Sequence, residues 1–506
     1  MFKSFLGYDL YQKKAQNNQE KRESRTIFNR SFRVLLAVIV GLVVWNLPPT
    51  VFGLDNLTLT EQRVIALFCF ATIMWICEGI PSWSTSVAIV VVLLFTASDS
   101  AFLPFKFAHE HQEIGMLISS KKIMACFADP IIMLFIGGFM LAIAATKAGL
   151  DVKLAKILLK PFGTKSENVL LGFILVTGVF SMFLSNTATA AMMLTFLAPV
   201  LKSLPQNGKG KIALALAIPL GANVGGIGTP IGTPPNAIAL KFLNDPEGMN
   251  MGIGFSDWMT FMMPFSIILL IIGWGILRML FPFTQKRIEL KIEQEHQVQL
   301  KRWQEIVVIV TFIVTILLWM FDKWTGIDSN VVAMLPVGVF CTTRIITKFD
   351  LAEINWCILW MVAGGFALGV ALQDTGLAKH LVSSIPFNEW PPVLMIVGSG
   401  LICYALANFI SHTATANLLI PILAMAGMSA AQSLEAFGGV STLLIGVSLG
   451  CSLAMILPIS TPPNALAHST GFIEQHDMMK LGISMGAIGL TLGYLMLVFI
   501  GKAGLI

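Results

Sequence analysis

Stretches of about 20 apolar residues recur along this chain, and they restrict its fold more than any other feature. A stretch of that length crosses the hydrocarbon core of a bilayer as an α-helix. Only 12% of the residues are charged, against about a quarter in a soluble domain. We therefore predict an all-α, polytopic membrane protein. The clearest candidate spans are residues 34–53, 62–80, 84–104, 130–148, 258–282, 304–321, 329–346, 356–375 and 480–501.

Basic residues gather in two segments that flank the predicted spans. One is the N-terminal segment, residues 1–33, and the other is a connector, residues 283–303, which separates a first half (34–282) from a second half (304–506). Because Lys and Arg are enriched in cytoplasmic loops, we predict that both segments are cytoplasmic in a multi-pass protein of the cell membrane. The net charge of +5 is small and dispersed, and it gives no indication of nucleic-acid binding.

Four further apolar regions are interrupted by polar residues or by glycine and proline: 166–204, 211–241, 391–428 and 438–468. Lysines lie on both sides of 166–204, so we predict a re-entrant hairpin that enters from the cytoplasm, with Asn186 at its tip. No Lys or Arg occurs between Leu381 and Met479. Region 391–428 is therefore predicted to be a hairpin that enters from outside, with His412 at its tip. Regions 211–241 and 438–468 are predicted to be broken helices.

The same motifs occur twice, in the same order, about 227 residues apart. The pairs are GGF at 137–139 and 364–366, SNTATA at 185–190 with SHTATA at 411–416, and GTPPNA at 232–237 with STPPNA at 460–465. Each motif alone is a weak signal, but the ordered pairing is not expected by chance. Together with the opposite polarity of the hairpins, it predicts an inverted repeat. Inverted repeats with interrupted helices are typical of alternating-access transporters.

The motifs combine broken backbone with neutral polar side chains. A Pro-Pro pair removes two amide donors and interrupts a helix, which frees the carbonyl oxygens of the preceding turn. Such carbonyls, together with Ser and Asn oxygens, suit Na+, and the N-terminus of a broken helix offers amide donors and a positive dipole end to a carboxylate. The side chains of Asn186, Thr187, Thr413 and Thr461 can hydrogen-bond a carboxylate while staying neutral.

At these motifs the sequence resembles the divalent anion/sodium symporter family, from about residue 62 to the C-terminus. The resemblance implies about eleven transmembrane helices plus two opposed re-entrant hairpins, a homodimer held by scaffold domains, and elevator-type movement of a transport domain. It also implies that Asn186 and Thr187 contact one substrate carboxylate, and that Thr413, Thr461 and Pro462 contact the other.

The resemblance further implies a first cation site made of Ser181, Ser185, Asn186 and a carbonyl near Gly232. Na+ is thus the candidate coupling ion, and no cofactor is expected. The partners implied are small dicarboxylate anions, the lipid bilayer and a second copy of the chain.

The second half departs from the family pattern at two positions. His412 stands where an asparagine is usual, and Ala407, which pairs with Ser181, has no side-chain oxygen. A neutral imidazole is a poor Na+ ligand, whereas a protonated one attracts a carboxylate, so His412 joins the substrate-binding candidates. The other interpretation is that His412 merely hydrogen-bonds the hairpin tip.

These departures favour exchange of one dicarboxylate of the succinate, malate, fumarate or 2-oxoglutarate class for another. The alternatives are Na+-coupled symport of a dicarboxylate or citrate, proton coupling and, more remotely, an anion channel. An enzyme is not expected, because the chain has no HExxH motif and Ser411 beside His412 lacks a third catalytic partner.

Overall fold

The computed structural model describes residues 31–54, 56–77, 79–107, 112–204, 208–245, 248–288, 300–377, 380–381 and 389–504. Within these ranges every named element is a helix, and the only strand-like pairs are two isolated β-bridges. The all-α prediction is therefore confirmed. Most of the N-terminal segment and of the connector, residues 1–30 and 289–299, lies outside the described ranges. Their cytoplasmic placement stays a prediction.

Seven helices in the described residues are long and apolar enough to cross a membrane, or eight if the bent pair His412–Ser429 and Ala431–Phe437 is one span. The seven are α2 (Leu59–Cys77), α4 continuing into α5 (Ser120–Lys147), α7 (Ser166–Phe183), α11 (Phe255–Leu280), α12 (Arg302–Met320), α16 (Trp356–Asp374) and α23 (Gln475–Lys502). Shorter apolar helices cover the other clear candidates, at Ser31–Asn46, Ser82–Thr96 and Ser329–Thr342. The count of about eleven spans with two re-entrant hairpins stays a prediction.

The described residues form two compact units, one within Met1–Phe127 and Cys357–Phe387, the other within Ala128–Trp356 and Asn388–Ile506. Each unit takes residues from both halves of the chain, because helices pack by their apolar faces rather than by chain order. Both tip motifs and both TPPN motifs lie in the second unit, whereas the two GGF motifs are divided between the units.

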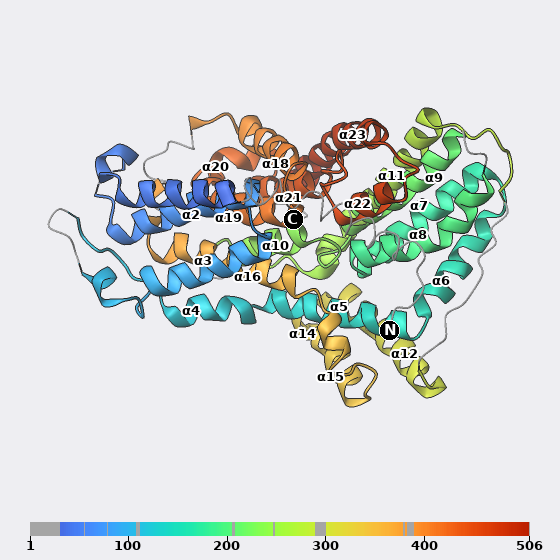
Figure 1. Cartoon of the computed structure of the whole chain (residues 1–506), viewed down its shortest axis with the longest axis horizontal. Helices are drawn as coiled ribbons and strands as arrows, with labels where there is room; N and C mark the ends of the chain where they lie inside the picture. Colours follow the sequence, from blue (N-terminus) through green and yellow to red (C-terminus); the bar gives the residue numbers. More distant parts are fainter. Residues whose placement is uncertain are drawn as a thin grey trace. The chain divides into compact units, whose positions relative to one another are not determined.

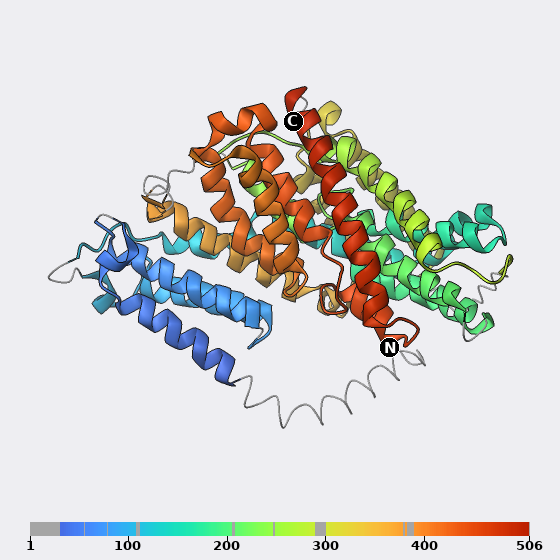
Figure 2. The same ribbon diagram turned by 90° about the horizontal axis from the view of Figure 1, so that it is seen from above.

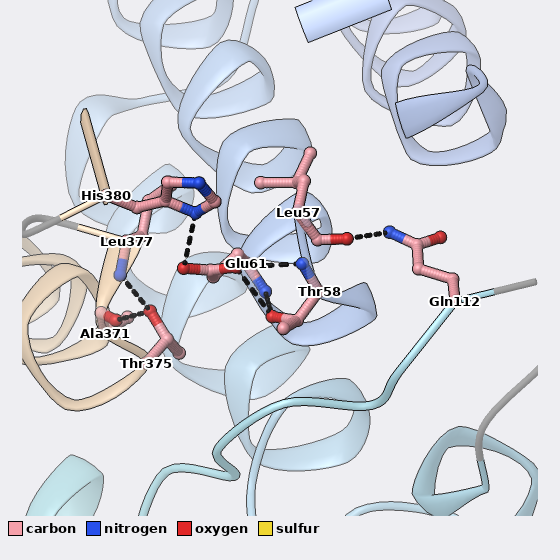
Figure 3. A network of polar contacts seen from close by, with 8 residues as sticks. All are labelled: Leu57, Thr58, Glu61, Gln112, Ala371, Thr375, Leu377 and His380. Atoms are coloured by element: carbon pink, nitrogen blue, oxygen red, sulfur yellow. Dashed lines mark hydrogen bonds and ion pairs between the residues drawn. The ribbon is translucent and has the colours of Figure 1, made fainter. Parts of the chain in front are cut away.

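The first unit joins α2 and α3 (Ser82–Thr96) to α16. Gly364 of α16 approaches the backbone of α3, where an added Cβ would lie 2.7 Å from Ser86 Cα. Glu61, only 5% exposed, accepts hydrogen bonds from the Thr58 N–H at 2.9 Å and the Thr58 hydroxyl at 2.8 Å (Figure 3). His380 Nδ1 lies 3.2 Å from the other carboxylate oxygen and ties α2 to the segment after α16 (Figure 3). Gly364, which belongs to the second GGF motif, therefore allows α16 to pack closely against α3.

The first-half part of the second unit contains α7, α8 (Asn186–Ser203), α9 (Lys209–Gly226) and α10 (Pro234–Leu243). Helices α7 and α8 contact each other, and both contact α9 (Figure 1). The chain breaks at Leu184 and Ser185, which are extended, and again between Gly226 and Pro234. Proline is well tolerated at the first position of a helix, so the Pro-Pro pair starts α10 cleanly.

The second-half part repeats this arrangement with α18 (Ser399–Ala407), α19 (His412–Ser429), α21 (Gly439–Ser452) and α22 (Pro462–Ser469). Helices α18 and α19 contact each other, and both contact α21. The long helix α23, red in Figure 2, contacts α21 as α11 contacts α9.

The C-terminal segments of the two broken helices are exchanged between the halves of the second unit. Helix α10 of the first half contacts α19 and α21, and α22 of the second half contacts α8 and α9 (Figure 1). Each TPPN segment therefore lies against the helix that starts at the tip motif of the other half. This exchange positions the candidate site.

Candidate functional site

The breaks create two tips at which a helix begins inside the second unit. Ser185 caps α8, its Oγ accepting from the Ala188 N–H at 3.2 Å, and Ser411 caps α19, its Oγ accepting from the Ala414 N–H at 3.1 Å. A cap of this kind satisfies one N–H of the first turn. The N–H groups of the first two helical residues have no acceptor within the helix. At both tips they point toward the break.

The two tips differ in exposure. Asn186 is half-buried and Thr187 is exposed, whereas His412 is 8% exposed and Thr413 is 6% exposed. The predicted site residues of the first tip are thus more open than those of the second.

The N-terminus of α22 offers few amide donors, as its Pro-Pro pair predicts. Pro462 and Pro463 have no N–H, and the Asn464 N–H already donates to Thr461 Oγ1 at 3.2 Å. The first three residues of α22 therefore leave no amide hydrogen free for a ligand. The Thr461 hydroxyl accepts from its own helix, so its hydrogen remains available to a ligand. Thr461 is buried and Pro462 is exposed.

A cluster of oxygen atoms surrounds the amide of Asn186. One terminal atom of that amide lies 2.5 Å from Ser181 Oγ, 3.0 Å from the Gly232 carbonyl oxygen and 3.2 Å from the Ala222 carbonyl oxygen. Ser181 is fully buried and also donates to the Ala222 carbonyl at 2.8 Å. Three of the four residues predicted for the cation site thus meet at one point, and Ala222 joins them. We name this group the Asn186 cluster.

Asn186 can present either end of its amide to the cluster, and the nitrogen is the end that satisfies the hydrogen bonds of the whole amide. With the amide nitrogen toward the cluster, Asn186 donates to the surrounding oxygens. With the amide oxygen there, four oxygens converge without a donor from Asn186, and a small hard cation is the species that such a set accepts. Ser185, the fourth predicted ligand, uses its Oγ to cap α8. Glycine is required at position 226, since an added Cβ would lie 2.8 Å from the Asn186 amide.

The matching position of the second half carries a nitrogen donor. His412 Nε2 lies 2.7 Å from the Ala454 carbonyl oxygen, and because a carbonyl only accepts, Nε2 carries the hydrogen. Ala407 is fully buried with no side-chain oxygen, and Asn408 Oδ1 accepts from the Ile456 N–H at 2.7 Å. His412 therefore donates from the start of α19 to the break between α21 and α22, rather than within the tip itself.

Both TPPN asparagines hold the break of their own half, a role that the sequence analysis did not assign. Asn236 Nδ2 faces the carbonyls of Gly226, Ile227 and Thr229 at 3.2, 3.3 and 2.8 Å. Asn464 Nδ2 donates to the carbonyls of Met455 and Leu457 at 2.9 and 3.0 Å. The carbonyls freed by each break are therefore largely satisfied by one buried amide. The sequence signal for this role is the presence of Asn236 and Asn464 at the same position of the two motifs.

Each of these asparagines also accepts a hydrogen bond from the opposite half. Ser448 of α21 donates to Asn236 Oδ1 at 2.9 Å, and Asn223 Nδ2 of α9 donates to Asn464 Oδ1 at 3.0 Å. Ser448 lies in a GVSLG sequence, 446–450, that matches the pattern of a serine nucleophile. It is fully buried within a helix rather than on a strand-to-helix turn, so it has no nucleophile geometry.

Comparison with known proteins identifies the family of the chain. The sodium:sulfate symporter transmembrane region matches residues 29–503. An uncharacterized transporter of Haemophilus influenzae is 32% identical over 85% of this chain and 91% of its own length. The sodium-dependent dicarboxylate transporter SdcS of Staphylococcus saprophyticus is 27% identical, covering 93% of this chain and 92% of its own.

Solved structures resemble the fold at low sequence identity. The Neisseria gonorrhoeae efflux pump MtrF has a TM-score of 0.54 at 13% identity over 83% of this chain and 95% of its own. The Alcanivorax borkumensis YdaH transporter has a TM-score of 0.51 at 12% identity over 84% and 99%. With a family match over nearly its whole length, this chain belongs to the sodium:sulfate symporter family, the divalent anion/sodium symporters, and is a membrane transporter rather than an enzyme.

Proposed function

We propose that the chain is a secondary transporter that couples the inward movement of Na+ to that of a small dicarboxylate. The observation that carries the proposal is the Asn186 cluster, in which a neutral amide, a buried hydroxyl and two backbone carbonyls converge at a helix break. The name of the SdcS relative, a sodium-dependent dicarboxylate transporter, supports the same coupling ion and the same substrate class.

Na+ would bind at the Asn186 cluster, with Asn186 turned so that its oxygen joins those of Ser181, Ala222 and Gly232. Ser185 would complete the set through the one lone pair that its Oγ has left. Backbone carbonyls at unwound helix segments are typical Na+ ligands in transporters built from inverted repeats. Binding would then fix the turn between α9 and α10 against α8.

The substrate would lie between the two tips. Asn186 and Thr187 would bind one carboxylate with free N–H groups and the Thr187 hydroxyl. Thr413 and the outward hydrogen of the Thr461 hydroxyl would bind the other, with Pro462 in apolar contact. His412 has its Nε2 hydrogen on Ala454, so we expect it to contact substrate only through its backbone N–H.

Alternating access would follow from the exchange of TPPN segments between the halves. Each half of the second unit packs as the other does, which supports an inverted repeat around a shared site. We further propose elevator-type movement, a homodimer and a cytoplasmic N-terminus, on the basis of the family resemblance and the basic residues in 1–33.

Na+ coupling replaces dicarboxylate exchange as the favoured reading. The sequence favoured exchange because His412 and Ala407 weaken a second cation site. The relatives' names and the Asn186 cluster favour symport through the first site, which needs neither residue.

The deciding experiment is uptake of labelled succinate into proteoliposomes. One set receives an inward Na+ gradient, a second receives choline in its place, and a third receives internal succinate without Na+. We expect the Na+ gradient to stimulate uptake most, and excess unlabelled sulfate to compete less than unlabelled malate. Uptake that is indifferent to Na+ and stimulated by internal succinate would overturn symport in favour of exchange.

A further inference from the structure

Within the part of the chain that the structure describes, the side chain of Asn223 makes one hydrogen bond, and that bond crosses between the halves of the second unit. The orientation of the pair is fixed from the other side. Asn464 must turn Nδ2 toward the carbonyls of Met455 and Leu457, which leaves Oδ1 facing Asn223. Asn223 must then present Nδ2, at 3.0 Å, because an oxygen there would face an oxygen.

This orientation leaves Asn223 Oδ1 buried without a donor among the described residues. Asn223 is 1% exposed, and Asn464 is 2% exposed. A buried carbonyl oxygen without a partner is costly, so an apolar residue would serve helix packing at position 223 better. Stability alone therefore does not explain why asparagine occupies position 223, and we look to its hydrogen bond with Asn464 for the reason.

The pair connects the two parts of the proposed site through few bonds. Asn223 directly follows Ala222, whose carbonyl belongs to the Asn186 cluster. Asn464 uses its backbone N–H to bind Thr461 Oγ1 at 3.2 Å, the hydroxyl proposed to hold a substrate carboxylate. A cation that fixes the end of α9 would thus fix, through this pair, the hydroxyl at the start of α22.

We propose that Asn223 and Asn464 are positioning residues that couple occupancy of the cation site to the affinity of the substrate site. The proposal rests on the proposed function and adds how Na+ binding in the first half is felt at Thr461 in the second. Coupling of this kind is reciprocal, so the substrate should raise Na+ affinity by the same factor.

The test compares succinate affinity of the purified protein at high and low NaCl, with choline chloride keeping ionic strength constant. The coupling factor is the ratio of the two dissociation constants. In Asn223→Leu we expect this factor to fall about 2- to 10-fold, the range of one net hydrogen bond. Affinity at low NaCl should stay near that of the native protein. Asn464→Leu should reduce the factor at least as much, because it also removes the bonds to Met455 and Leu457, and the double variant should reduce it no further than Asn464→Leu alone.

Ser266→Ala is the matched control. Ser266 is fully buried and donates to the Val224 carbonyl at 2.6 Å, so this change also removes a buried hydrogen bond at the end of α9. That bond comes from α11 of the same half and does not reach α22. We expect Ser266→Ala to lower thermal stability and to leave the coupling factor unchanged. An equal fall in the control would overturn the proposal, since the effect would then be general loosening of α9.

A second measurement needs no variant, in case Asn223→Leu does not fold. NaCl alone, without succinate, should slow hydrogen–deuterium exchange in the segment 461–466 of the native protein, relative to choline chloride. Unchanged exchange there overturns the coupling. The two proposals can be refuted separately. If NaCl does not change the succinate affinity of the native protein, Na+ coupling itself is refuted. If NaCl raises the succinate affinity of Asn223→Leu as much as that of the native protein, only the role of the Asn223–Asn464 pair is refuted.

Discussion

Replacing Ser181 with alanine should weaken Na+ activation of transport far more than it alters the maximal rate. Ser181 is fully buried in α7, donates to the Ala222 carbonyl at 2.8 Å and lies 2.5 Å from the Asn186 amide. Alanine keeps the Cβ and favours the helix, so the substitution removes little besides the hydroxyl. The Asn186 cluster then has one oxygen fewer.

The size of the effect follows from what the hydroxyl does. Loss of one partner leaves a buried polar group unsatisfied, at a cost of about 1–3 kcal/mol. If that loss falls on the Na+-bound state, the half-saturating Na+ concentration should rise about 5- to 150-fold, because 1.4 kcal/mol is a factor of ten. The substrate N–H donors at the two tips do not involve Ser181, so the rate at saturating Na+ should be retained.

The assay is the initial rate of succinate uptake into proteoliposomes over a series of Na+ concentrations. Thr177→Val is the matched control, since Thr177 lies one turn earlier on α7, is fully buried and donates within its own helix to the Phe173 carbonyl. Valine preserves its shape and removes one buried hydroxyl. Its Na+ dependence should match that of the native protein.

Two results would refute the reasoning. An unchanged half-saturating Na+ concentration in folded Ser181→Ala would remove the Asn186 cluster from cation binding. An equal shift in Thr177→Val would assign the effect to α7 as a whole rather than to a ligand. Thermal unfolding of both variants, with and without NaCl, separates lost folding from lost binding, because a bound cation stabilises only the folded state.

Three further predictions concern the tips and the first break. Thr187→Ala and Thr413→Ala should each lower succinate uptake about tenfold or more, since each removes a donor to a charged group, and normal uptake by folded protein would exclude that residue. Combining Ala407→Ser with His412→Asn rebuilds the residue types of the first-half cluster and should steepen the dependence of uptake on Na+; an unaltered Hill coefficient would contradict this. Gly226→Ala, whose Cβ would lie 2.9 Å from the Gly232 carbonyl oxygen, should abolish Na+-driven uptake, and native Na+ dependence would show that the break tolerates a wider spacing.

The helices were predictable because a helix needs about 20 apolar residues to cross the lipid bilayer. A run predicted at 130–148 is the helix Pro130–Lys147, and a run predicted at 356–375 is Trp356–Asp374. Proline at a first position marks such a start in the sequence itself. The two compact units were not predictable from the same pattern. Helices that are apolar on most faces carry little information about which neighbour they contact.

The breaks were predictable from local sequence, but the contacts across them were not. The tip motifs were predicted at residues 185–187 and 411–413, and there the structure has Ser185 and Ser411 as helix caps, for which serine is a favoured residue. Asn223 and Ser448 lie in otherwise apolar helices, and nothing local indicates that they bind Asn464 and Asn236 of the opposite half. Contacts of this kind depend on the exchange of TPPN segments, which is a property of the packed unit.

The two breaks resemble each other because their motifs are duplicated. They differ because Asn186 in the first half corresponds to His412 in the second. In the first half the amide of Asn186 lies among the oxygens of Ser181, Ala222 and Gly232, and its own oxygen would join them if Na+ binds as proposed. In the second half His412 brings its own hydrogen to Ala454, and this contact is complete without an ion. We infer that the proposed cation site belongs to the first half. In the second half the side chain of His412 takes the corresponding place. If Na+ binds as proposed, the first half is thus the half from which it would act on the substrate site.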